Sequence, residues 1–444
     1  MFYLQHFKNF EKAEIDYERP VTLLVGPNGA GKSNLIEAIE LLAFIGSGRP
    51  LHEITDFGRE GGLEVRGGLD VCASHGHDTF TLGHRSIIST PEGDHEAHYE
   101  ISIRIAKEPR IAGEFLKIVG REIPVFEVLP SEEESASADN QVRYDNNARG
   151  KNKPVTSVAA DRSALSQYSR FALGNKKLPE TLAVINAVSN ALAAPSVFDP
   201  LPRLMRNYER TTETRLARNG FNISPVLFWL CQRRVIRTLD PKTKKWVLKT
   251  IDQKDIADRI LRRISQLPDE PFTDFDFIRT KTSDVMFGFK TPHDEKPVTA
   301  RILSDGTLRA LAILTALEIS PASQRLILEE FDNGVHPSRV QILSEALFEC
   351  AVRNKLRVIA TTQNPATLNA LTDEQYGSVL FVVHDFGKKF ARLLPLVDLP
   401  GYIEFMEQGR LGDLITRRVY ERHLGGDYEG ERKKEIEQWL NNLP

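Results

Sequence analysis

One stretch near the start of the chain decides the fold, and it reads Gly26-Pro27-Asn28-Gly29-Ala30-Gly31-Lys32-Ser33. It fits the phosphate-binding loop pattern G-x-x-x-x-G-K-[ST], whose glycines let backbone N–H groups approach a triphosphate. In this pattern Lys32 reaches the β- and γ-phosphates, and the Ser33 hydroxyl ligates Mg²⁺. The stretch therefore predicts a site for a nucleoside triphosphate with Mg²⁺.

The residues on both sides of this loop agree with that interpretation. Residues 21–25 (VTLLV) form a continuous apolar run, which predicts a buried strand. Leu35, Ala38, Ile39 and Leu42 recur at helical spacing, so a helix N-terminus is expected beneath the phosphates. The alternative interpretation, an ordinary glycine-rich turn, does not explain a strand before the loop and a helix after it.

Length and composition indicate a globular protein of two to three domains. The chain has 444 residues, of which 41% are hydrophobic and 27% charged, with a formal net charge of −3. This charge excludes a bulk attraction to nucleic acid or membrane but permits a local basic face. The three scattered cysteines favour a reducing compartment, and no apolar run approaches the ~20 residues of a membrane span. We therefore expect a cytoplasmic protein.

The periodicity of the sequence changes twice along the first 270 residues. Residues 99–105 alternate between apolar and polar, which predicts a half-buried strand with residues 63–71 and 79–88 as its antiparallel neighbours. Residues 130–154 are polar and predict an exposed loop. From about residue 160 to 265 the apolar residues return to helical spacing.

Polar residues follow the short apolar strands in the last third of the chain. Glu329 and Glu330 follow residues 326–328, and Gln363 follows residues 358–362. Because these strands alternate with helices, they predict a parallel sheet that binds ligands at its carboxyl edge. Hydrolysis of a phosphoanhydride needs a carboxylate for the metal and a group that orients water, and two adjacent glutamates can supply both.

Four motifs in a fixed order resemble the ABC-type ATPase heads of the SMC, RecF and OLD class. They are the phosphate loop with NLIEAI behind it, LSDGTLR at 303–309, EEFDNGVHP at 329–337 and ATTQNP at 360–365. The last three are similar to the ABC signature, the Walker B and D-loop run, and the switch loop. The closest likeness is to compact AAA-type ATPases of bacterial antiphage systems such as Septu, PARIS and the OLD nucleases.

This resemblance implies roles for individual residues. Glu329 would be the Mg²⁺-associated acid, and Glu330 the general base, acting with Lys32 and Gln363. Ser304 and Gly306 would touch the γ-phosphate of a nucleotide bound to another subunit, so that each site is built from two chains of a homodimer or higher oligomer. The nucleotide-binding residues implied in this way are Asn28, Gly29, Ala30, Gly31, Lys32, Ser33, Asn34, Ser304, Asp305, Gly306 and His336. Ser33 and Glu329 would hold the metal.

The chain departs from the family pattern at three places. Walker B usually carries Asp where this chain has Glu329, and the switch residue is Gln363 instead of His. Gln can donate a neutral hydrogen bond but cannot carry a proton charge, so we expect slow turnover. No Gln occurs between Lys32 and Gln141, so the usual Q-loop residue is not identified.

The expected fold is an α/β, ABC-type P-loop ATPase head with an antiparallel β subdomain and a helical insertion. Its predicted parts are residues 1–160 (first half of the core with the β subdomain), 161–270 (helical insertion), 271–400 (second half of the core) and 401–444 (helical tail). Only about 60 residues follow the strand at 379–383, too few for the Toprim nuclease of OLD proteins. The resemblance then implies a sensor or scaffold subunit of an antiphage system with a separately encoded effector.

Two other functions remain open at this stage. One is a RecF-like, DNA-binding repair ATPase, and the other is a nucleotide-binding scaffold without hydrolysis. The arginines between 203 and 218 and the basic residues between 233 and 245 allow either a nucleic-acid or partner-binding face, or a charged helix surface with i,i+3 pairs to Glu209 and Glu213. The five histidines between His75 and His98 match no zinc spacing, so we interpret them as polar faces of hairpins.

Overall fold

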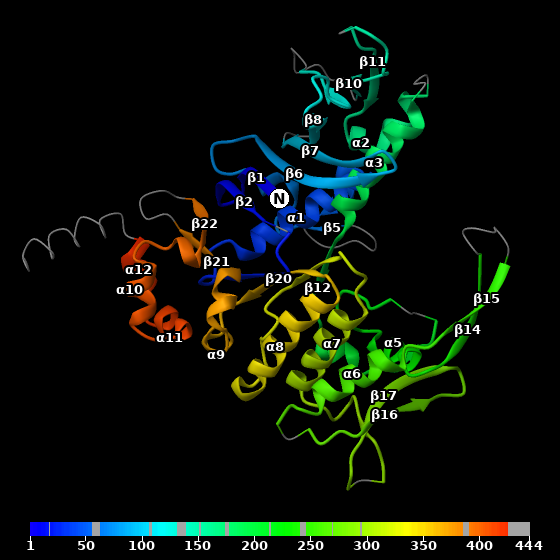
Figure 1. Cartoon of the computed structure of the whole chain (residues 1–444), viewed down its shortest axis with the longest axis vertical. Coiled ribbons are helices and arrows are strands. Elements are labelled where there is room, and N and C mark those ends of the chain that lie inside the picture. Colours follow the sequence, from blue (N-terminus) through cyan, green and yellow to red (C-terminus); the bar gives the residue numbers. More distant parts are fainter. Residues whose placement is uncertain are drawn as a thin grey trace, which may run out of the picture. The chain divides into compact units, whose positions relative to one another are not determined.

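The computed structural model describes the chain in two compact units. It covers all residues except 17, 56–62, 106–108, 131–138, 151, 174–176, 213–214, 240–245, 269, 294, 385–389 and 425–444. Unit 1 comprises residues 1–18, 26–195 and 380–394, and unit 2 comprises residues 19–25, 196–379 and 395–444. Figure 1 labels their elements.

Unit 1 is built on a mainly antiparallel sheet with the strand order β11-β10-β9-β8-β7-β6-β1-β2-β22-β21. Its main strands are β1 (Phe2–Phe7), β2 (Phe10–Ile15), β6 (Thr79–Thr90), β7 (Gly93–Arg104), β8 (Arg110–Ile118), β9 (Phe126–Val128), β10 (Asp139–Tyr144), β11 (Val155–Ala159), β21 (Val379–His384) and β22 (Ala391–Pro395). Its helices are α1 (Lys32–Gly46), α2 (Ala164–Phe171) and α3 (Leu178–Ala193). Alternating burial along β7 explains why this strand was recognisable from sequence.

Two sequence-based expectations for unit 1 are wrong. Residues 63–71 are not an antiparallel neighbour of β7: β5 (Leu63–Glu64) pairs in parallel with β4 (Ile54–Thr55), and residues 69–71 form a 3₁₀ turn. Gly67 and Gly68 both have positive φ and form a turn after the strand, so the chain does not continue as a strand to residue 71. Residues 130–154 are not a loop throughout, because β10 pairs with β9 and β11. The neighbouring residues 131–138, with the acidic run at 132–134, lie outside the described part of the chain.

Unit 2 contains strands in the order β3-β20-β19-β12, of which β3, β20 and β19 run parallel. These are β3 (Val21–Val25), β12 (Pro195–Phe198), β19 (Arg325–Leu328) and β20 (Arg357–Thr362). β3 and β19 are buried along their whole length, as continuous apolar runs in a parallel sheet require. The register pairs Thr362 with Val25 and Ala360 with Leu328, so the three strands end at one edge. The strands predicted at 21–25, 326–328, 358–362 and 379–383 are thus confirmed.

The remaining elements of unit 2 are helices, a small sheet and a hairpin. The helices are α4 (Pro202–Met205), α5 (Ile223–Leu230), α6 (Lys254–Ile264), α7 (Asp305–Ile319), α8 (Pro337–Arg353), α9 (Pro365–Asn369), α10 (Tyr402–Glu407), α11 (Leu411–Thr416) and α12 (Val419–Leu424). β13 (Glu209–Arg210), β16 (Asp274–Arg279), β17 (Asp284–Lys290) and β18 (Val298–Thr299) form the small sheet, and β14 (Arg234–Leu239) pairs with β15 (Trp246–Ile251).

A buried ion-pair network joins three helices of unit 2. Glu318 on α7 accepts from Arg259 Nε on α6 at 2.9 Å and also pairs with Arg353 on α8. The Glu318 side chain is almost fully buried, so the two arginines must compensate the cost of removing its negative charge from water. The network fixes α7, whose first turn carries the signature motif.

The structure contradicts one of the two interpretations of the arginines between 203 and 218, the charged helix surface. α4 ends at Met205, and Glu209 and Arg210 form β13 against β17, so no helix presents i,i+3 pairs there. Glu213 and the lysines at 242–245 lie outside the described residues. The α/β fold with parallel core strands and an antiparallel β part is confirmed. Residues 161–270 contain α2 to α6 and also β12 to β15, and α2 and α3 pack within unit 1. The division into four parts stays a prediction.

The buried Glu114 predicts a pH-dependent stability of unit 1. Glu114 accepts hydrogen bonds from Tyr99 Oη (2.9 Å) and from the backbone N–H groups of Ala164 and Leu165, but burial raises its pKa to about 7. Because the unfolded chain releases this proton near pH 4.5, stability falls as the pH rises from about 4.5 to 7. In chemical unfolding, the free energy of unfolding of Glu114→Gln relative to wild type should rise by about 2.5 kcal/mol between pH 5 and 8.

The exposed Glu11 on β2 provides a matched control for that experiment. The Glu11→Gln variant should follow the wild-type pH profile. Parallel profiles for Glu114→Gln and wild type would contradict the assignment.

Candidate functional site

The phosphate loop in unit 1 has the backbone geometry that the sequence pattern requires. Gly29 and Gly31 have φ values of 80° and 115°, which favour glycine. A Cβ at Gly26 would lie 2.3 Å from Val382 O, so this position also excludes a side chain. α1 begins directly after Gly31 with no side-chain cap and no acidic residue in its first turn. Its first N–H groups therefore suit an anionic ligand.

Side chains from the β1–β2 turn and from the start of α1 support the same loop. Asn9, which follows β1, donates from Nδ2 to Ala30 O at 3.0 Å and accepts from Asn34 Nδ2 at 2.7 Å. Lys32 is only 8% exposed, and its Nζ donates to Gly26 O at 2.6 Å and to Pro27 O at 3.0 Å. Asn28 and Gly29 are exposed, and Ser33 is half-buried. The donor set of this loop fits a triphosphate with its metal, which the Ser33 hydroxyl could ligate.

The acidic residues in unit 2 lie where β19 ends. Glu330 has a φ of 41°, which is unusual for a residue with a side chain. Its N–H donates to Thr361 Oγ1 at 2.7 Å, and Arg309 NH2 donates to the carbonyls of Glu329 (3.0 Å) and Glu330 (3.2 Å). These contacts hold Glu330 in its strained backbone conformation.

The Glu330 carboxylate is oriented by two amide side chains. Asn333 Nδ2 donates to Oε2 at 2.9 Å, and Gln363 Nε2 lies 3.4 Å from Oε1. The structure thus brings together Glu330 and Gln363, which the sequence placed on separate motifs. A carboxylate with a fixed direction and partial exposure can accept a proton from a water molecule.

A buried aspartate joins the two loops that carry Glu330 and Gln363. Asp332 is 3% exposed, and its Oδ2 accepts from Thr362 Oγ1 at 2.5 Å and from the Thr367 hydroxyl. Burial raises the pKa of Asp332, and the two hydroxyl donors act in the opposite direction. Sequence reasoning assigned no role to Asp332 or Arg309. The sequence offered one indication of a role for these two residues: each lies inside a recognised motif, at 303–309 and 329–337.

The signature residues occupy the exposed start of α7. Ser304 caps the helix, with Oγ accepting from Thr307 N at 3.1 Å, and Asp305 pairs with Arg206 at 2.7 Å. A Cβ at Gly306 would lie 2.8 Å from Gly334 O, so only glycine permits this approach of α7 to the D-loop. His336 is exposed and caps α8, where Ser338 N donates to its ring at 3.3 Å.

A polar cluster ties the signature helix to α8. Arg339 NH1 donates to Thr307 Oγ1 at 2.9 Å and to Glu270 Oε1 at 3.0 Å, and Glu270 also accepts from the Thr307 hydroxyl. The cluster connects the first turn of α7 to the start of α8, and Ser304 beside it is exposed.

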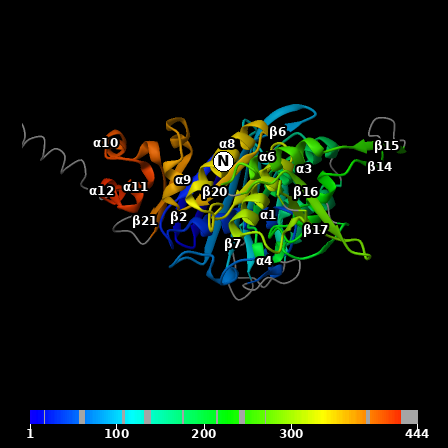
Figure 2. The ribbon, with the colours of Figure 1, turned by 90° about the horizontal axis from the view of Figure 1, so that it is seen from below.

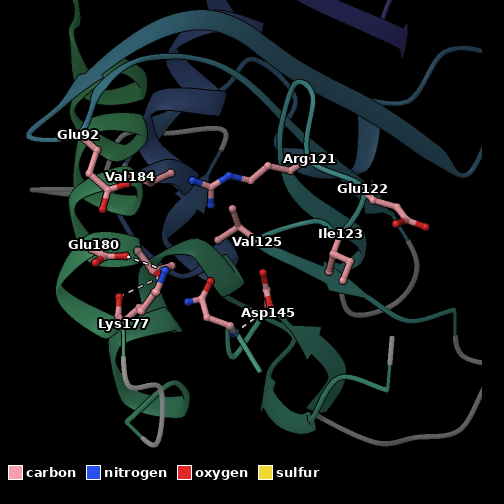
Figure 3. Close-up of a pocket in the computed structure, with 11 residues that line it drawn as sticks. Glu92, Arg121, Glu122, Ile123, Val125, Asp145, Lys177, Glu180 and Val184 are labelled. Atoms are coloured by element: carbon pink, nitrogen blue, oxygen red, sulfur yellow. Dashed lines mark hydrogen bonds and ion pairs between the residues drawn. The ribbon is translucent and has the colours of Figure 1, made fainter. Parts of the chain in front are cut away.

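A separate pocket of about 450 Å³ lies in unit 1 (Figure 3). Glu92, Arg121, Glu122, Asp145, Lys177 and Glu180 supply its charged lining. None of the predicted site residues lines it. Within the described residues, no group of three or more His, Cys, Asp or Glu could hold a metal ion, and no helix has the length and apolar character to cross a bilayer.

Two protein-family models match the chain. One, described as "AAA domain", matches residues 2–180, and the other, described as "AAA domain, putative AbiEii toxin, Type IV TA system", matches residues 191–369. Each therefore spans one part of the chain. Both describe an AAA domain.

Curated relatives match over short stretches. The DNA replication and repair protein RecF of Synechococcus sp. (strain JA-2-3B'a(2-13)) is 51% identical over 47 residues, which is 11% of this chain and 12% of the relative. RecF of Picosynechococcus sp. (strain ATCC 27264 / PCC 7002 / PR-6) is 32% identical over 80 residues, 18% of this chain and 20% of the relative. The chain thus spans a fifth or less of the length of these relatives. Together with the family matches, these relatives show that parts of the chain are similar to AAA domains and to RecF proteins.

Solved SMC head structures are also similar to the chain. A crystal structure of the Smc head bound to the C-winged helix domain of ScpA has a TM-score of 0.45 and 11% identity, covering 88% of this chain and 96% of that chain. The SMC head domain from Thermotoga maritima has a TM-score of 0.39 and 14% identity, covering 89% and 97%.

The contacts of Asp332 predict a measurable contribution to the stability of unit 2. Asp332→Ala removes the acceptor of two buried hydroxyl donors and should lower the free energy of unfolding by about 2–3 kcal/mol in a urea titration. Asp332→Asn keeps one acceptor oxygen and should cost about half as much. The exposed Asp373 in the 373–378 turn provides the Asp→Ala control. A change in Asp332→Ala no larger than in Asp373→Ala would contradict the role of this link.

Proposed function

We propose that this chain binds ATP with Mg²⁺, hydrolyses it slowly and dimerises under nucleotide control. The observation that carries the proposal is the arrangement around Glu330. Its backbone is fixed by Thr361 and Arg309, and its carboxylate is directed by Asn333 and Gln363. Such a pre-positioned base, in a chain that also has a complete phosphate loop, suits attack of water on a γ-phosphate.

The proposed roles follow from the chemistry of each side chain. Residues Asn28 to Asn34 would enclose the phosphates, and Lys32 would turn from its loop carbonyls to them. Ser33 and Glu329 would hold Mg²⁺, which supplies positive charge to the β- and γ-phosphate oxygens. Glu330 would take the proton of the attacking water, and the neutral amide of Gln363 would donate a hydrogen bond nearby.

The exposed start of α7 supports a composite site between two copies. Ser304 and Asp305 are exposed and Gly306 is half-buried, while His336 is exposed at the start of α8. In the proposed homodimer these residues complete the nucleotide site of the other copy. The interface is then isologous, with two equivalent sites.

The proposed biological role is that of a sensor or scaffold subunit in a bacterial antiphage system. The match of residues 191–369 to a family described with a toxin–antitoxin system supports a defence context. In this role, nucleotide-dependent dimerisation would restrain or recruit a separately encoded effector. A second candidate, a RecF-like repair ATPase, is supported by the RecF identity of 51% over 47 residues. A scaffold that binds ATP without hydrolysis is the third.

Glu330→Gln tests the hydrolytic assignment. The amide cannot accept the proton of water, so turnover should fall about 100-fold or more while ATP affinity stays within about threefold of wild type. Phosphate release and binding of a fluorescent ATP analogue measure the two quantities. Wild-type protein without turnover would favour the scaffold, and unchanged turnover in the variant would refute Glu330 as the base.

Gln363→His tests the cause of slow turnover. An imidazole can carry a positive charge near the γ-phosphate, so the variant should turn over ATP about 10-fold faster than wild type. Gln363→Ala serves as the control, because it removes the donor without adding charge. Unchanged or lower activity in Gln363→His would count against Gln363 as the switch residue.

Purification of Glu330→Gln protein from its native host with ATP separates the biological candidates. A stoichiometric effector protein that depends on ATP would support the defence role. Nucleic acid retained without such a protein would support the RecF-like alternative.

A further inference from the structure

The hairpin of β14 and β15 exposes several large apolar side chains of unit 2. We name its residues Arg233–Leu239 and Trp246–Ile251 the basic ribbon. Its strands pair mainly with each other, and the ribbon extends away from α5 and α6 (Figures 1 and 2). An isolated two-stranded hairpin is marginally stable in water, so a partner that covers its apolar side chains would stabilise it.

The basic ribbon and its connecting segment carry a concentrated positive charge. Residues 233–251 contain seven Lys or Arg and one Asp, in a chain whose net charge is −3. Arg233 and Arg237 are exposed, and Arg234 and Arg237 lie on opposite faces because side chains alternate along a strand. The charges at 240–245 are known from the sequence alone, since these residues lie outside the described structure. A partner with negative charge is therefore favoured.

One face of the ribbon exposes an aromatic and aliphatic surface beside this charge. Val235, Trp246 and Leu248 are 63%, 61% and 76% exposed. Arg237 lies opposite Leu248 in the register, and its guanidinium is 5.4 Å from the Trp246 ring centroid. The flat indole ring of Trp246 therefore lies next to the positive charge of Arg237.

We propose that the basic ribbon binds a single strand of nucleic acid. Its arginines meet the phosphates, and an unpaired base stacks on Trp246 with Leu248 and Val235 beside it. A second copy of the same ribbon is disfavoured because two such charges repel. A duplex offers phosphates but hides its base faces, so it does not use the exposed indole. Binding of a single strand at the basic ribbon is a separate activity from ATP binding and does not require ATP.

Fluorescence anisotropy with the full-length protein tests the proposal. The probes are a labelled oligothymidylate of about 20 nucleotides, the matching oligouridylate and a duplex of equal length. Arg233→Gln/Arg234→Gln/Arg237→Gln should weaken binding of both single strands at least about tenfold and reduce the log–log salt slope by about two. Trp246→Ala should weaken single-strand binding about fivefold or more and leave duplex binding unchanged.

Matched controls separate binding at the ribbon from a general effect of lost positive charge. Lys12→Gln/Arg104→Gln/Lys117→Gln removes three exposed charges from unit 1 and should leave binding within about twofold. Lys32→Ala should also retain binding, which distinguishes this proposal from the ATPase assignment. Circular dichroism confirms that each variant is folded. No single-strand binding by wild type at low salt, an equal loss in the control triple variant, or an equal effect of Trp246→Ala on duplex would overturn the proposal.

Discussion

The proposed chemistry depends on the fixed position of Glu330 at the end of β19. Its left-handed backbone, with a φ of 41°, costs free energy that the surrounding hydrogen bonds must offset. Thr361 accepts from the N–H and Arg309 donates to the carbonyl, so the backbone has no freedom to relax to an ordinary strand conformation. The carboxylate is then presented in one direction, between Asn333 and Gln363.

The same contacts connect Glu330 to the signature helix. Arg309 lies on α7, so the helix that begins at Ser304 also holds the backbone of Glu329 and Glu330. Gly306 brings the first turn of α7 against Gly334, and Arg339 joins Thr307 to Glu270. A change at the exposed Ser304 surface thus has a short physical route to Glu330, the proposed general base. In the proposed function, a nucleotide at Ser304 would act on the position of Glu330 along this route.

Local sequence patterns were sufficient for the phosphate loop and the strands around it. β3, β19 and β20 are short apolar runs, and the phosphate loop is contiguous, so neither requires knowledge of long-range contacts. The links that hold Glu330 could not be predicted in this way. Asp332 and Thr362 are 30 positions apart, and their pairing appears only when β19 and β20 are aligned.

The incorrect predictions of secondary structure also have their cause in contacts between distant parts of the chain. The strand β10 was hidden because it alternates in a polar segment, with only Asn140 and Val142 buried. The sequence around Arg210 has helical charge spacing, yet pairing with β17 determines its structure. The roles of Asn28, Ser33, Ser304 and His336 in nucleotide binding stay predictions, because they concern a ligand and a second copy of the chain.

Complementation between two inactive variants tests the composite nucleotide site most directly. Lys32→Ala removes the phosphate lysine, and Ser304→Arg blocks the signature surface, so neither variant alone should hydrolyse ATP. A mixed dimer contains one site with Lys32 from the second variant and Ser304 from the first, and that site is intact. We predict that mixing the two proteins restores ATP turnover clearly above that of either alone. A mixture that stays as inactive as its components, although the two proteins associate, would contradict the account.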